Sequence, residues 1–201
     1  MKHKFIIFGA GQGIRLNMGL PKILVPLGDK LLCQYQIETI RAVCPKAEIL
    51  YVIGYKADLA REVLAPYNVD IIENTIYDTV GGDINYTAGI STFVLCRGYD
   101  KPKMIVRIDG DMLFSKQFVK DCMKPRKVTV IAYPSLCEVY PIKDYAGKVY
   151  PIAYSITGGC YYDTLAELFR LVKPRIRISH HYVEIDSQVD LERALKFAAT
   201  I

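Results

Sequence analysis

At 201 residues the chain has the length of one domain, and its composition of 51% hydrophobic and 23% charged residues can supply a full-sized core. This excludes an intrinsically disordered chain, and the modest net charge of +5 fits a phosphate-rich ligand without requiring a nucleic acid. The first apolar run stops at Gly9, and no stretch approaches the about 18 apolar residues of a membrane span. A cytoplasmic protein that does not bind a membrane is therefore expected.

The first half of the chain alternates predicted strands and helices. Short apolar runs bounded by glycine or acidic residues predict strands, and apolar residues three or four apart predict helices. In chain order we expect a strand at 5–8, a helix at 31–43, a strand at 48–53, a helix capped by Asp58 and ending at Leu64, a strand at 69–72, a helix at 84–95 and a strand at 104–108.

Beyond residue 125 the order of elements changes. We expect strands at 128–133 and 148–157, a helix at 163–172, a strand at 175–184 and a helix at 189–198. Apolar strands that alternate with helices imply a sheet with helices on both faces. The predicted fold is therefore α/β, a three-layer α/β/α sandwich around a mainly parallel mixed sheet, in one domain that covers residues 1–201.

The cysteines and the basic clusters do not indicate a zinc site or a nucleic-acid-binding site. The six cysteines include no Cys-x-x-Cys pair and no histidine at ligand spacing, so we expect reduced, mostly buried thiols and no zinc site. Basic clusters at 101–103, 124–127 and 173–177 fall where helices are expected to end. Because the helix dipole favours cations there, we interpret them as helix ends and do not expect nucleic-acid binding.

A glycine-rich loop follows the first strand. Its candidate ligand-binding residues are Gly9, Ala10, Gly11 and Gly13. Glycines let the backbone approach phosphate oxygens with its N–H groups. A dinucleotide loop would need glycine where Ile14 stands, and a P-loop would need the sequence GK[ST], which is absent. What remains is a glycine loop followed by Arg15 and then by Pro21 and Lys22.

Carboxylates follow two of the predicted strands. Asp109, Gly110 and Asp111 come directly after the strand at 104–108, at the end of a strand where open parallel sheets bind ligands. Such carboxylates suit Mg²⁺, although an exposed acidic turn is the ordinary alternative. Asp186 follows the strand at 175–184, and either Asp186 or Ser187 could simply cap the last helix.

Together, the GAGQGIR loop, the PKILVPLG segment and the Asp-Gly-Asp triplet resemble the nucleotidyltransferases of the glycosyltransferase-A type of α/β fold. That family includes sugar-1-phosphate uridylyl- and thymidylyltransferases, phosphocholine cytidylyltransferases and methylerythritol-phosphate cytidylyltransferases. The resemblance covers residues 5 to about 60, 104–114 and 183–196. It implies a nucleotide-diphospho-sugar transferase-like fold, with a nucleotide-binding half at 1–125 and an acceptor-binding half at 126–201.

The resemblance also implies an activity. A nucleotidyl group, most simply cytidylyl, would pass from a nucleoside triphosphate (CTP or UTP favoured) to phosphocholine, a sugar phosphate or a similar small phosphorylated acceptor, with release of pyrophosphate. Asp111 and Asp186 would hold Mg²⁺, and Asp109 would contact the ribose or orient the loop. Arg15 would grip the β- and γ-phosphates with its planar fork, and Lys22 would stabilise charge at the α-phosphate. A solvated lysine beside a turn proline is the alternative for Lys22.

The base and the acceptor stay open. In the family a small-residue turn lies against the base, which makes Gly81 and Gly82 candidate base contacts. However, the segment 77–85 has neither the paired asparagines of phosphocholine-type members nor the Gly-Thr turn of sugar-type members. Seven tyrosines between residues 133 and 162 could cage a quaternary ammonium, stack on a sugar or simply lie in strands.

Two other functions remain in view. A glycosyltransferase of the same fold would also use the Asp-Gly-Asp triplet with a divalent metal, but its nucleotide-sugar donor has no triphosphate for Arg15 and Lys22 to hold. A non-catalytic nucleotide-binding module is the third alternative, kept open by the unusual segment 77–85 and the short length of the chain, whereas intact Arg15, Lys22 and Asp111 argue against it. The oligomeric state is not indicated by the sequence.

Overall fold

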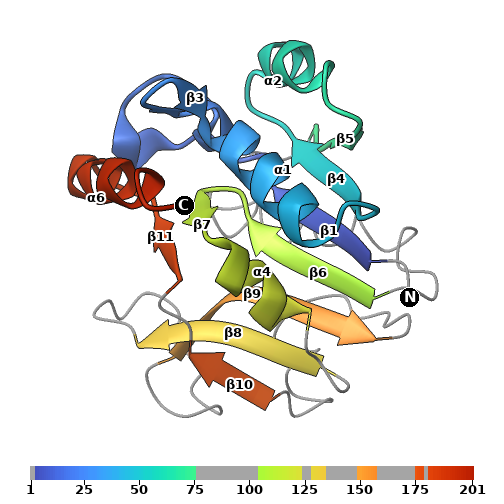
Figure 1. Ribbon diagram of the computed structural model, residues 1–201. Coiled ribbons are helices and arrows are strands. Elements are labelled where there is room, and N and C mark those ends of the chain that lie inside the picture. Colours follow the sequence, from blue (N-terminus) through green and yellow to red (C-terminus); the bar gives the residue numbers. More distant parts are fainter. Residues whose placement is uncertain (1–2, 76–103, 124–127, 135–148, 158–174, 179–180) are drawn as a thin grey trace.

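The computed structural model describes residues 3–75, 104–123, 128–134, 149–157, 175–178 and 181–201. A seven-stranded sheet with the strand order β10-β8-β9-β6-β1-β4-β5 runs through the molecule (Figure 1). Its strands are β1 (His3–Phe8), β4 (Glu48–Ile53), β5 (Asp70–Glu73), β6 (Met104–Asp109), β8 (Val128–Pro134), β9 (Val149–Thr157) and β10 (Arg175–Ile178).

The sheet is mixed but mainly parallel. β1 is parallel to both β4 and β6, β4 is parallel to β5, and β8 is parallel to β10. Only β9 runs against its neighbours β6 and β8. Phe8 lies opposite both Val52 of β4 and Asp109 of β6, so the carboxyl ends of three neighbouring strands meet at one edge. This is the edge at which such sheets bind ligands.

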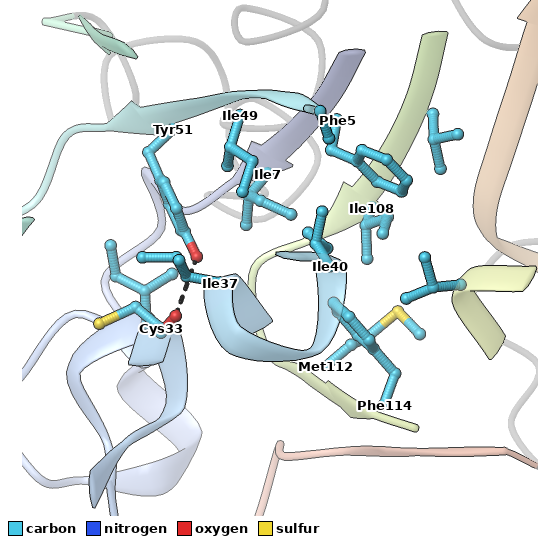
Figure 2. Packing of buried hydrophobic residues seen from close by; sticks show 14 of the residues in the cluster. Phe5, Ile7, Cys33, Ile37, Ile40, Ile49, Tyr51, Ile108, Met112 and Phe114 are labelled. Atoms are coloured by element: carbon cyan, nitrogen blue, oxygen red, sulfur yellow. Dashed lines mark hydrogen bonds between the residues drawn. The ribbon is translucent and has the colours of Figure 1, made fainter. Parts of the chain in front are cut away.

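Four helices are described: α1 (Leu32–Val43), α2 (Ala57–Leu64), α4 (Lys116–Cys122) and α6 (Gln188–Ala198). The main core lies between the sheet and α1, α2 and α4. Phe5 and Ile7 of β1 pack in it with Ile37 and Ile40 of α1, and all four are buried (Figure 2). Since Ile37 and Ile40 are three residues apart, they fall on one face of the helix. On the opposite face of the sheet, Ile6 of β1 belongs to a second cluster with residues of β4.

Two small antiparallel pairs complete the described structure. β2 (Pro26–Leu27) and β3 (Lys30–Leu31) form a hairpin before α1. β7 (Met112–Phe114) follows β6 after a tight turn and pairs with β11 (Tyr182–Glu184) near the end of the chain. The β7–β11 pair therefore brings the segment that leads into α6 against the turn after β6 (Figure 1).

The predicted α/β fold with a mainly parallel mixed sheet is confirmed. Most of the expected elements are found, with each end within two residues of its expected position. These are the strands expected at 5–8, 48–53, 69–72, 104–108, 128–133 and 148–157 and the helices expected at 31–43 and 189–198.

Two details of the predicted secondary structure are wrong. Asp58 lies inside the first turn of α2, and the N-cap is Lys56 in a left-handed conformation with φ 48°. The strand expected at 175–184 is two strands, β10 and β11, that pair with different partners. The sequence analysis also missed β7 and α4.

Several predictions fall outside the described residues. These are the helices at 84–95 and 163–172, the base contacts Gly81 and Gly82, the basic clusters at 101–103 and 124–127, and Cys96, Cys137 and Cys160. Of the remaining cysteines, Cys33 and Cys122 are buried as expected and Cys44 is half-buried. Burial raises the pKa of the Cys33 thiol to about 12, so this thiol stays protonated. Within the part of the chain that the structure describes, no helix is both long and apolar enough to cross a bilayer.

Candidate active site

The glycine loop begins at the carboxyl end of β1 and is fixed against the neighbouring strand. The Gly9 N–H donates to Val52 O at 2.8 Å, and the Tyr55 N–H donates to Ala10 O at 3.0 Å. Ala10 is buried within this loop. A Cβ added at Gly11 would have no atom within 4 Å, so the loop borders open space at this position.

Gly13 explains the spacing between the glycine loop and Lys22. Its φ of 64° is left-handed, and a Cβ there would lie 2.9 Å from Lys22 Cγ. A side chain at residue 13 would therefore be strained and would also push the lysine stem away. The loop and the Pro-Lys segment are thus packed together as one unit, with Lys22 at the start of a short 3-10 helix, Lys22–Leu24.

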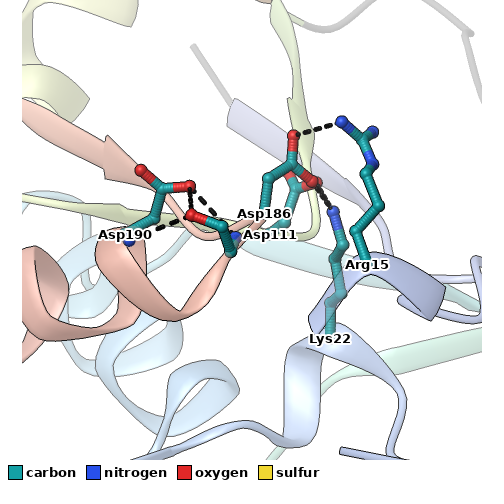
Figure 3. Close-up of polar contacts among 6 residues, drawn as sticks. Arg15, Lys22, Asp111, Asp186 and Asp190 are labelled. Atoms are coloured by element: carbon teal, nitrogen blue, oxygen red, sulfur yellow. Dashed lines mark hydrogen bonds and ion pairs between the residues drawn. The ribbon is translucent and has the colours of Figure 1, made fainter. Parts of the chain in front are cut away.

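Four predicted site residues meet beside this loop. Lys22 Nζ lies 2.7 Å from Asp111 Oδ2 and also forms an ion pair with Asp186 (Figure 3). Arg15 Nη1 lies 3.3 Å from Asp186 Oδ2. The side chains of Lys22 and Asp111 are only 15% and 17% exposed, whereas that of Arg15 is 62% exposed. Two cations from the N-terminal segment therefore face carboxylates from two distant segments, and the arginine retains access to solvent.

Lys22 and Asp109 have shifted pKa values in this site. Burial would lower the pKa of Lys22, but Asp111 and Asp186 outweigh that effect and hold its pKa above the usual range. The ammonium is therefore firmly charged. Burial raises the pKa of Asp109 well above its usual range, and the negative charges of Asp111 and Glu184 act in the same direction.

A third carboxylate joins the two that the sequence indicated. Asp111, Glu184 and Asp186 each offer an oxygen, and these oxygens lie within 4.8 Å of one another. Asp111 Oδ1 is buried and has no hydrogen-bond partner among the described residues. Clustered hard oxygen donors with one unsatisfied buried oxygen fit a divalent cation such as Mg²⁺. The signal for Glu184 was its spacing, because residues two apart along an extended segment point to the same side.

Backbone hydrogen bonds hold the two segments that carry these carboxylates. The Gly110 N–H donates to Phe8 O at 3.0 Å, which holds the turn after β6 against β1. A Cβ at Gly110 would lie 2.5 Å from Phe8 O, so only glycine fits there. On the other side, the Ile185 N–H donates to Asp111 O at 2.9 Å. This bond fixes the segment 184–186 beside Asp111.

Asp186 does not cap the last helix. Ser187 is the N-cap of α6: its Oγ lies 3.3 Å from the Asp190 N–H, and its own N–H lies 3.0 Å from Asp190 Oδ2. These two reciprocal bonds form a capping box. Because Ser187 satisfies the helix end, the carboxylate of Asp186 is available to the cluster.

Comparison with known proteins places this geometry in context. A family model described as MobA-like NTP transferase domain matches residues 5–134. The bifunctional protein GlmU of Gloeothece citriformis is 34% identical over 68 residues, which are 33% of this chain and 15% of that protein. The match therefore spans only a small part of that relative.

Solved structures resemble nearly the whole chain. The CTP:phosphocholine cytidylyltransferase from Streptococcus pneumoniae superposes with a TM-score of 0.68 at 19% identity and covers 98% of this chain and 100% of its own. A nucleotidyl transferase from Methanothermobacter thermautotroptrophicus gives a TM-score of 0.71 at 14% identity and covers 100% of this chain and 99% of its own. At these identities the likeness establishes a shared fold.

Proposed function

The chain belongs to the family of MobA-like NTP transferase domains, and from this premise we propose that it transfers a nucleotidyl group from a nucleoside triphosphate to a small phosphorylated acceptor and releases pyrophosphate. The predicted family and the predicted enzyme class, a nucleotidyltransferase, are confirmed by that membership. The observation that carries the proposal is the meeting of Lys22 with Asp111 and Asp186 at the strand edge beside the glycine loop.

Arg15 and Lys22 are proposed to bind the triphosphate. A triphosphate carries about four negative charges, and an attacking phosphate adds repulsion at the α-phosphorus. Arg15 is exposed and has a planar fork that suits two phosphate oxygens at once. Lys22 is a compact, largely buried cation, which suits charge that develops at the α-phosphate during transfer. Gly9, Ala10, Gly11 and Gly13 would present backbone to the phosphates.

The carboxylates are proposed to hold Mg²⁺. Asp111 and Asp186 would be ligands as the sequence predicts, and Glu184 lies close enough to be a third. When bound, the ion would neutralise and orient the phosphates. Asp109 would contact the ribose or orient the turn. No general base is needed, because a phosphate acceptor is already an anion near neutral pH.

The finer assignments follow the proteins that the chain resembles. We propose cytidylyl transfer from CTP, with UTP as the second choice, to phosphocholine or a sugar phosphate, as the fold is that of a CTP:phosphocholine cytidylyltransferase. Gly81 and Gly82 would contact the base, residues 1–125 would form the nucleotide-binding half of a single domain, and residues 126–201 would form the acceptor-binding half. These substrates are consistent with a cytoplasmic protein.

A glycosyltransferase is the second candidate, since it would use the same Asp-Gly-Asp triplet. It is less favoured because a nucleotide-sugar donor has two phosphates and no triphosphate, whereas Lys22 at the carboxylates and Arg15 beside them offer two cations suited to a triphosphate. A non-catalytic nucleotide-binding module is the third. It would bind nucleotide at the same place without turnover.

The deciding experiment is a substrate matrix. Each nucleoside triphosphate is incubated with Mg²⁺ and a panel of phosphorylated alcohols and sugars, and products are identified by mass. We expect pyrophosphate and one nucleotidyl product from the wild type and almost none from the Asp111→Asn variant. Consumption of a nucleotide sugar with no use of triphosphates would favour the glycosyltransferase. Tight nucleotide binding without any product would favour the binding module.

A further inference from the structure

A buried amide from α1 reaches the turn that carries Asp111. Gln36 is 1% exposed, and its Nε2 lies 3.1 Å from Gly110 O and 2.8 Å from Met112 O. These are the carbonyls of the residues on either side of Asp111. Both amide hydrogens are therefore used, one on each flank of the aspartate.

Tyr51 supports the orientation of this amide from its other end. Its hydroxyl lies 3.0 Å from Gln36 Oε1 and 3.3 Å from Cys33 O, both of which are acceptors (Figure 2 shows Tyr51 beside Cys33). Tyr51 is fully buried, and burial raises its pKa well above the usual range, so the hydroxyl keeps its proton. If the amide were turned over, its oxygen would face two carbonyl oxygens. The two carbonyls therefore set the orientation of the amide, and the single hydrogen of the Tyr51 hydroxyl supports it when it is donated to Gln36 Oε1.

We propose that Gln36, supported by Tyr51, is a positioning residue that fixes the turn at residues 110–112 so that the Asp111 carboxylate faces Lys22 and Asp186. This inference rests on the proposed role of Asp111 as a metal ligand. Gln36 itself would not touch substrate or metal. It would act through the backbone on either side of Asp111.

Core packing does not account for a glutamine at this position. Gln36 lies in the interior with its helix neighbour Ile37, where an apolar side chain would be the ordinary choice. A buried amide is tolerated only when its polar atoms are paired. Here the amide pairs the two carbonyls of a turn in which the chain leaves β6 and enters β7. An apolar residue would leave both carbonyls without that donor.

Two further restraints on the turn come from backbone hydrogen bonds. The Gly110 N–H is bonded to Phe8 O, and Asp111 O accepts from the Ile185 N–H. These bonds hold the turn from the side of β1 and from the side of β11. Gln36 supplies the restraint from α1, and it is a restraint that a single side-chain substitution removes.

Gln36→Met is the sharpest variant, because methionine has a similar length and lacks the donors and the acceptor. Tyr51→Phe is a milder variant that removes only the hydroxyl that supports the amide. Arg41→Ala is the matched control. Arg41 is on the same helix and donates to Ala47 O at 2.6 Å and to Asn68 O at 2.7 Å, away from the carboxylates.

The experiment measures Mn²⁺ binding to each full-length variant by electron paramagnetic resonance, together with the thermal midpoint of unfolding. Gln36→Met is expected to weaken Mn²⁺ binding by about tenfold, the scale of losses when a supporting contact behind a metal ligand is removed. Tyr51→Phe should shift Mn²⁺ affinity in the same direction by less. Arg41→Ala should lower the midpoint and leave Mn²⁺ affinity unchanged.

Two outcomes separate this inference from the proposed function. If Asp111→Asn weakens Mn²⁺ binding but Gln36→Met and Tyr51→Phe only lower the thermal midpoint, the positioning role is overturned and the metal site stands. If Asp111→Asn binds Mn²⁺ as well as the wild type, the metal assignment fails and the positioning role fails with it. If Gln36→Met does not fold, Tyr51→Phe decides: an unchanged affinity for Mn²⁺ would overturn the role.

Discussion

At the scale of single residues, Lys22 links the fold to the proposed chemistry. Its ammonium lies between Asp111 and Asp186 and offsets the repulsion between their charges. Lys22→Met should therefore make the protein less stable in EDTA, and Mg²⁺ should raise the thermal midpoint of the variant more than that of the wild type. Thermal scans of both proteins with and without Mg²⁺ measure this. An identical response to Mg²⁺ would contradict the pairing of Lys22 with the metal ligands.

The same substitution also tests the proposed reaction. If Lys22 stabilises charge at the α-phosphate, Lys22→Met should lower the rate of pyrophosphate release by about tenfold or more. Initial rates at saturating substrates measure this, with Mg²⁺ added to reduce the difference in stability and at a temperature well below both thermal midpoints. A variant with the wild-type rate would exclude Lys22 from the transition state.

Two glycines of the loop should respond differently to alanine. Gly11 borders open space, so Gly11→Ala should fold normally and yet weaken triphosphate binding if phosphates approach the backbone there. Gly13→Ala places a side chain at φ 64° and against Lys22, and should lower the free energy of unfolding by about 1–2 kcal/mol. Urea denaturation measures the stability of each variant, and calorimetric titration with a triphosphate measures its affinity. Normal triphosphate affinity in Gly11→Ala would argue against close approach.

At the scale of elements, the start of α6 is the clearest case of local sequence that determines structure. The Ser187 and Asp190 capping box ends the extended segment immediately after Asp186. Ser187→Ala should lower the free energy of unfolding by about 1 kcal/mol. Asparagine is another good N-cap residue, so Ser187→Asn should retain most of the stability that the cap contributes. Urea denaturation of both variants provides the measurement. Equal stability of the alanine variant and the wild type would show that the cap contributes nothing.

The elements that sequence analysis predicted well are those whose signal is local. Apolar runs identified β1, β4 and β6, and the helical spacing of apolar residues identified α1. The division between β10 and β11 was missed because no glycine or proline interrupts residues 175–184, whereas the partner strand of each half is decided by tertiary pairing. Short elements such as β7 are stabilised mainly by their neighbours, so they leave little trace in the sequence.

At the scale of the whole molecule, the site is made by segments that are distant in the chain. Lys22 and Asp186 are 164 residues apart, and the bond from the Ile185 N–H to Asp111 O joins the two segments that carry the three carboxylates. The sequence indicated Arg15, Lys22, Asp111 and Asp186 through motif spacing, and the structure brings these four together. It gave no signal for Gln36, because nothing in a helical pattern tells which carbonyls a buried amide will meet.

The fate of the α-phosphate tests the central claim most directly. The wild type is given a nucleoside triphosphate labelled at the α-phosphate, and in a parallel reaction one labelled at the γ-phosphate, with Mg²⁺ and the accepted phosphorylated substrate. Our account predicts that the α-label moves to the acceptor and the γ-label leaves in pyrophosphate. The Asp111→Asn variant should neither label the acceptor nor release labelled pyrophosphate. An α-label that stays out of the acceptor, or full transfer by Asp111→Asn, would contradict it.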